Sequence, residues 1–101
     1  MGNDPNFAAE PDSATLEFER IEGELEAAIV FAAAAEFQFQ NGNPEFAATC
    51  LSDAVDGYTT AVRALPTANL AGAQLEDLTA RLIQLKHLLD GLRTPIRNEA
   101  A

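Results

Sequence analysis

The sequence predicts an all-α protein built as a three-helix, up-down-up antiparallel bundle, and two observations carry this prediction. Apolar residues recur at alternating spacings of three and four along three segments, as they do in helices that bury one face. Breaks containing glycine or proline, at residues 41–44 and 66–72, separate these segments. We therefore expect one three-helix domain at 13–94, between flexible tails at 1–12 and 95–101. A chain of 101 residues buries only a thin core, so dimerisation is an option that would complete the bundle.

The first helix is expected at about residues 13–40. Its core stripe keeps heptad spacing over three repeats and consists of Phe18, Ile21, Leu25, Ala28, Ala32, Ala35 and Phe39. Glutamates fill most other positions of the first half, whereas from Ala27 onward the helix is apolar nearly all round. A helix that is apolar on every side has to be covered on every side. The surplus apolar residues that we expect at an interface are Val30, Phe31, Ala34 and Phe37.

The turn between the first two helices has a clear local signature. Gly42 can take the left-handed conformation that ends a helix, and Asn43 can cap the next helix through its side-chain oxygen. Pro44 suits the first helical position, where the N–H would lack a partner in any case. The sequence therefore predicts that the first two helices fold back on each other as an antiparallel hairpin.

The second and third helices are expected at about 44–65 and 72–93, ended by Pro66 and Pro95, respectively. The second has an alanine-rich stripe of Ala47, Leu51, Ala54, Tyr58, Ala61 and Leu65. The third has a leucine stripe of Leu75, Leu78, Leu82, Leu85, Leu89 and Leu92. Small residues let two backbones approach closely, so we expect the first two helices to pack tightly and the leucines to fill the groove between them.

Charge narrows the classes of partner. The net charge is −10, and residues 1–60 hold twelve acidic residues against one basic residue, while residues 61–101 hold four acidic and five basic residues. Nucleic-acid binding needs a basic surface, so we expect no nucleic-acid partner. No apolar run is long enough to span a bilayer, and the single cysteine, Cys50, cannot form an internal disulfide. We expect a cytoplasmic protein that has no membrane association.

Three stretches of the chain carry a resemblance to known helical modules. They are the turn Gly42-Asn43-Pro44-Glu45-Phe46-Ala47, the series Ala54, Tyr58, Ala61 and Pro66, and the third-helix run from Arg81-Leu82 to Leu88-Leu89. Together these stretches, within residues 28–92, resemble tetratricopeptide-like and microtubule-interacting-and-trafficking (MIT) modules. The resemblance implies a module that binds peptides or partner helices. Only one copy of the hairpin is present, whereas tetratricopeptide proteins stack several.

Few residues suggest a catalytic or metal-binding site. Arg81 and His87 have an Arg-x5-His spacing that resembles the ribonuclease motif of the HEPN family, which would imply a catalytic imidazole and a phosphate-stabilising cation. In that motif a polar residue commonly follows the arginine, whereas in this chain the apolar Leu82 follows Arg81. His87 with Asp90 is more simply a local ion pair, and no further ligands suggest a metal site. We expect no cofactor and no metal.

The sequence therefore favours a non-enzymatic helical module for protein–protein interaction that acts as a homodimer or with another protein. Two alternatives remain open: a HEPN-like ribonuclease or inactive relative, and an acidic inhibitor or immunity-type protein that masks a basic partner. In an antiparallel homodimer, the acidic start of each first helix would lie toward Arg93 and Arg97 of the partner's third helix.

Overall fold

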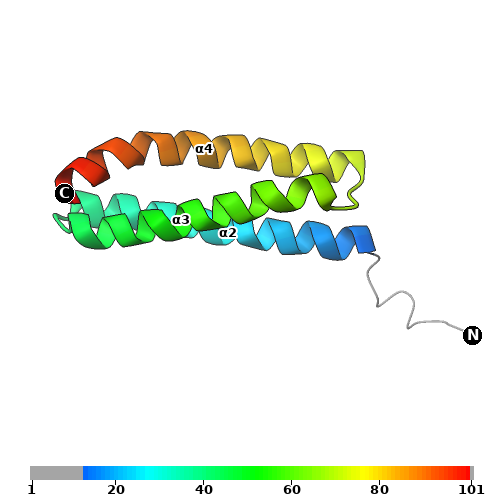
Figure 1. Ribbon diagram of the computed structural model, residues 1–101, viewed down its shortest axis with the longest axis horizontal. Coiled ribbons are helices and arrows are strands. Elements are labelled where there is room, and N and C mark those ends of the chain that lie inside the picture. The colour runs from blue at the N-terminus through cyan, green and yellow to red at the C-terminus, as the bar shows by residue number, and fades with distance from the viewer. Residues whose placement is uncertain (1–12, 101) are drawn as a thin grey trace, which may run out of the picture.

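The computed structural model describes residues 13–100, which form three long helices and one short 3-10 turn. The helices are α2 (Ser13–Gln40), α3 (Pro44–Ala64) and α4 (Gly72–Ala100), and the turn is η1 (Leu65–Thr67). Figure 1 shows α2 and α4 running in the same direction, with α3 antiparallel to both. The described residues contain no strand, so the all-α, up-down-up prediction is confirmed. The expected tail at 1–12 lies outside the described residues.

The closest helix pair is α2 with α3, as the alanine stripes predict. Ala28, Ala32 and Ala35 of α2 are buried with Ala47 and other small residues of α3. At Gly57 a Cβ atom would lie 2.9 Å from Cβ of Ala28 and 3.3 Å from the backbone oxygen of Glu24. No side chain larger than hydrogen fits at such a distance. The two backbones therefore approach closely here because a glycine faces an alanine.

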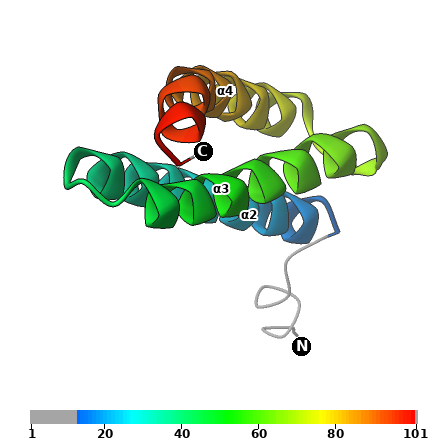
Figure 2. The same ribbon diagram turned by 60° about the vertical axis from the view of Figure 1, so that its left-hand side comes forward.

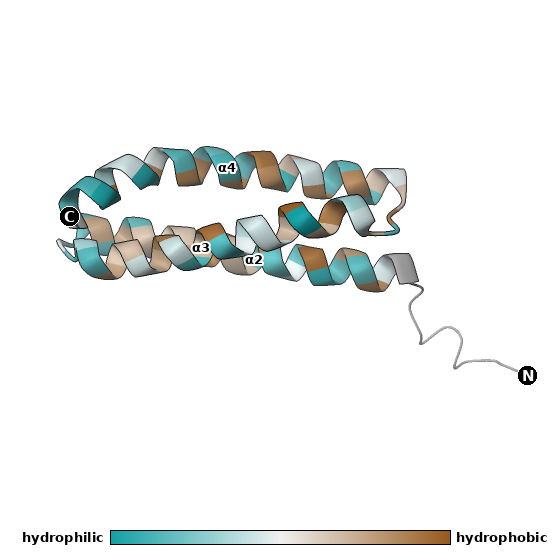
Figure 3. Cartoon of the chain, viewed as in Figure 1, coloured by the Kyte–Doolittle hydropathy of each residue, from teal (hydrophilic) through white to brown (hydrophobic). Residues whose placement is uncertain are grey.

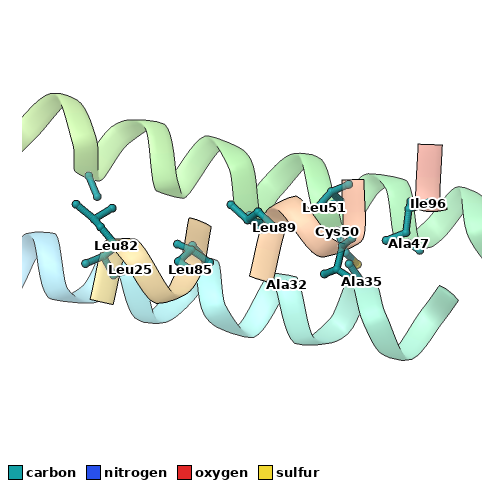
Figure 4. Close-up of a cluster of buried hydrophobic side chains, with 14 of the residues drawn as sticks. Leu25, Ala32, Ala35, Ala47, Cys50, Leu51, Leu82, Leu85, Leu89 and Ile96 are labelled. Atoms are coloured by element: carbon teal, nitrogen blue, oxygen red, sulfur yellow. The ribbon is translucent and has the colours of Figure 1, made fainter. Parts of the chain in front are cut away.

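The third helix closes the core with larger side chains. Figure 4 shows Leu82, Leu85, Leu89 and Ile96 of α4 reaching the space between α2 and α3. In Figure 2, α4 lies over the α2–α3 pair, to which it supplies the third wall of the core. The first leucine of the expected stripe, Leu75, is an exception because it is exposed. Figure 3 shows apolar and hydrophilic residues interleaved along all three helices, as expected of helices that bury one face.

The hairpin turn has the predicted backbone but not the predicted cap. Gly42 has a φ of 81°, the left-handed conformation, and Pro44 begins α3. Asn43 precedes α3, but its side chain makes no capping hydrogen bond. Its Nδ2 instead donates to Oε1 of Gln38 at 2.9 Å. The prediction of a side-chain cap was therefore wrong, because the amide of Asn43 ties the turn back to α2.

The predicted end of the third helix at Pro95 was also wrong. The helix α4 continues through Pro95 to Ala100, so residues 95–100 are its last turns and not a flexible tail. A proline inside a helix removes one hydrogen bond and bends the axis, and Figure 1 shows α4 curving at this end. Ile96 continues the leucine stripe four residues after Leu92 and is 0% exposed. Burial of this side chain offsets the lost hydrogen bond.

The connection between α3 and α4 is fastened to the start of the bundle. The helix α3 ends at Ala64, next to the predicted Leu65, and Pro66 lies in η1. The backbone N–H of Asn69 donates to Oε1 of Glu17 at 3.0 Å. This hydrogen bond joins the first turns of α2 to the segment that leads into α4.

Candidate interaction surface

The helix α2 carries a second apolar line of residues on the side opposite its core stripe. Leu16, Gly23, Val30 and Phe37, here called the outer stripe, are spaced seven residues apart. Seven residues are close to two helical turns, so the four positions follow one side of the helix. Val30 is 66% exposed and Phe37 is 61% exposed, and Leu16 and Gly23 are exposed as well. Among residues 13–100, no other part of the chain covers this line.

The structure separates the four interface residues predicted from the sequence. Val30 and Phe37 belong to the outer stripe, and Ala34 is half-buried at the edge of the core. Phe31 lies elsewhere, because it lines a groove of about 300 Å³ between α2 and α3. This groove is rimmed by acidic side chains, including Asp53 and Asp56. The predicted set therefore comprises two outward residues, one edge residue and one groove residue.

The predicted set omitted the amino-terminal half of the outer stripe. Leu16 and Gly23 lie among glutamates, and the amphipathic pattern of this half drew attention to its buried face alone. A search for the same seven-residue spacing on the opposite side of the helix would have found them. Their presence extends the apolar line along most of α2.

Charge along α2 changes at the middle of the outer stripe. The first half carries Glu17, Glu19, Glu22, Glu24 and Glu26 against Arg20. The second half, residues 27–40, carries only Glu36. Two copies of this face would repel each other in a parallel arrangement, because acidic halves would lie side by side.

The basic end of α4 faces a different side of the bundle. Arg93 and Arg97 line a groove of about 420 Å³ between α3 and α4, whose apolar residues include Leu51, Val55 and Ile96. The outer stripe lies on α2, which does not line this groove. Within one chain these arginines and the outer stripe therefore lie on different helices, and the predicted pairing of Arg93 and Arg97 with the acidic start of a partner's first helix stays a prediction.

Arg81 makes the main charged contact between helices. Its guanidinium lies 3.0 Å from a carboxylate oxygen of Glu22, 3.5 Å from one of Glu26 and 3.4 Å from one of Asp77. Sequence reasoning missed this cluster, although the parallel course of the first and third helices brings residues 17–26 near the start of α4. Part of the acidity of α2 is thus neutralised within the chain.

The Arg81 and His87 pair gains no support as a nuclease site from this arrangement. The two residues are six apart on one helix, which puts their side chains about 120° apart around its axis. Arg81 is already held by three carboxylates, whereas a phosphate-stabilising cation has to be available to the substrate. His87 is exposed on α4.

The expected ion pair between His87 and Asp90 is replaced by other contacts of Asp90. Nζ of Lys86 donates to Oδ2 of Asp90 at 2.8 Å, and Arg93 approaches the other oxygen at 3.9 Å. The hydrogen bond from Lys86 lowers the pKa of Asp90 below its ordinary value. Asp90 is therefore part of a charged row along α4.

Residues 13–100 offer little for a metal site, a reactive thiol or a membrane-spanning helix. Among these residues, no group of three or more His, Cys, Asp or Glu side chains could hold a metal ion. Cys50 is a free thiol buried in the core. Across the same residues, no helix is both long and apolar enough to cross a membrane.

Comparison of the chain with protein-family models, curated proteins and solved structures finds no match. The resemblance to tetratricopeptide-like and MIT modules therefore remains a prediction from the sequence, and the case for function rests on the geometry of the outer stripe.

Proposed function

We propose that this protein is a non-enzymatic helical interaction module that self-associates through the outer stripe of α2. The observation that carries the proposal is the exposure of Val30 and Phe37 on a line that repeats every seven residues and so follows one side of the helix. Large apolar side chains aligned at that spacing are typical of a contact between helices, whereas scattered exposed apolar residues are ordinary.

A second copy of the chain is the partner that best fits this face. Only three helices enclose the core. The side formed by α2 and α3 is built largely from alanine, which buries little apolar area per residue. Association through α2 would cover Val30 and Phe37 and surround the apolar half of this helix with other helices. The same surface on both copies is what a two-fold homodimer requires.

The proposal is tested by placing a charge at Val30, between Gly23 and Phe37 of the stripe. We expect Val30→Asp to make the protein monomeric at concentrations where the unmutated chain is dimeric, because the interface would have to bury a carboxylate with no partner. Sedimentation velocity gives the molar mass directly. Circular dichroism checks that the variant remains helical.

A matched control is available on another helix. Ile83 lies near the middle of α4, is 53% exposed and is β-branched like Val30. Ile83→Asp adds the same charge, so we expect it to leave association unchanged. Dimers that survive Val30→Asp, or that Ile83→Asp disrupts equally, would refute the proposal that α2 is the contact surface.

A further inference from the structure

The outer stripe has a shape that fits itself in one orientation. Val30 is the third of its four residues, with Gly23 seven residues before it, Phe37 seven residues after it and Leu16 beyond Gly23. A Cβ atom added at Gly23 would meet no other atom within 4 Å, so the stripe has an open gap at this position. Phe37 projects at the matching position on the other side of Val30. Gap and projection each lie about 10 Å from Val30 along the helix.

We propose that two copies of α2 pack antiparallel about a two-fold axis at Val30, so that Phe37 of each copy fills the gap at Gly23 of the other. This inference rests on the proposed function and specifies its geometry. A two-fold axis at Val30 brings residue 23 of one copy opposite residue 37 of the other at both ends of the contact. A large side chain then faces a glycine twice, and the two valines meet at the centre.

The charge distribution along α2 selects the same orientation. In a parallel pair, Glu19 and Glu26 of one copy would lie beside the same residues of the other copy. In the antiparallel pair, position 26 lies opposite Ala34 and position 19 lies opposite Asn41, and both of these are uncharged. In the same register Glu24 lies level with Glu36 of the other copy, but each is about 120° around the helix from Val30 and therefore off the seam. Along the seam itself, the acidic half of each helix meets the nearly neutral half of its partner, which avoids like-charge contacts there.

Filling the gap tests the pairing of Phe37 with Gly23. We expect Gly23→Leu to raise the dissociation constant of the dimer by about tenfold or more, since the new side chain would occupy the space that receives Phe37. Gly91→Leu is the matched control, because Gly91 is also an exposed glycine inside a helix with no atom within 4 Å of an added Cβ. That control is expected to leave the dissociation constant unchanged. Equal affinity of Gly23→Leu and the unmutated chain would overturn the pairing.

Cysteine cross-linking tests the orientation. In a Cys50→Ala background, which removes the only native thiol, we expect Val30→Cys to oxidise to a disulfide-linked dimer. Phe37→Cys alone should remain unlinked, because antiparallel packing separates its two copies by about 20 Å along the helices, far beyond disulfide reach.

The outcomes separate this inference from the proposed function. A protein that dimerises but links through residue 37, or fails to link through residue 30, refutes the antiparallel geometry and leaves self-association intact. A Cys50→Ala chain and an unmutated chain that are both monomeric throughout refute the proposed function itself.

Discussion

The two long faces of α2 both carry residues that repeat every seven positions, but the inner face has two apolar residues per heptad and the outer stripe has one, and the faces differ in what lies against them. The inner face, with Ile21, Leu25 and Ala28, is buried by α3 and α4. The outer stripe repeats every seven residues, with Val30 and Phe37 well exposed. Periodicity therefore identifies a face suited to helix packing, while the partner that covers it can come from the same chain or from another one.

Substitutions on these two faces should differ most in their effect on the free energy of unfolding. Leu25 is 0% exposed, so Leu25→Ala leaves a cavity and is expected to lower the free energy of unfolding by about 3 kcal/mol. Val30→Ala should change it by no more than about 0.5 kcal/mol when measured on dilute, monomeric protein. Urea denaturation followed by circular dichroism measures both. Similar losses at the two positions would mean that Val30 is buried within the single chain.

A smaller effect is expected where α2 and α3 approach most closely. Gly57→Ala is expected to lower the free energy of unfolding by about 1–2 kcal/mol, because its Cβ would lie 2.9 Å from Cβ of Ala28. Gly91→Ala should instead raise it by about 0.5–1 kcal/mol, since alanine is the better helix former and space is open there. The two changes are chemically identical. Stabilisation by both would show that the helices are farther apart at Gly57 than the structure has them.

The smallest effect concerns the charged row on α4. The hydrogen bond from Lys86 lowers the pKa of Asp90 below its ordinary value of 3.8, so its contribution to stability is present above that value and is lost as the pH falls through the lowered pKa. The urea midpoint of Asp90→Asn should therefore lie slightly below that of the unmutated chain near neutral pH. The two midpoints should converge once the pH has fallen below the lowered pKa. A difference that persists in acid would mean that Asp90 acts through something other than its charge.

Much of the fold could be predicted from the sequence because its signals are local. Gly42 and Pro44 mark the hairpin, and Pro66 marks the end of α3 within a residue or two. The same rule was wrong at Pro95, where burial of Ile96 keeps the helix intact. Local steric preferences decide a helix end only where tertiary packing does not oppose them.

The candidate surface was harder to predict than the fold. The sequence indicates that α2 has more apolar residues than one face can bury, but it does not separate Phe31, which lines a groove, from Phe37, which projects outward. That distinction depends on where α3 lies beside α2. The contact of Arg81 with Glu22 and Glu26 likewise depends on the alignment of helices that are distant in the sequence.

The central claim is that the unmutated chain self-associates through its outer stripe, and sedimentation equilibrium between about 1 and 100 μM tests it most directly. We expect the molar mass to rise with concentration toward twice the 10.8 kDa of a single chain. We also expect Val30→Asp to stay at the mass of one chain across the same range. A mass of 10.8 kDa for the unmutated chain at every concentration would contradict the claim.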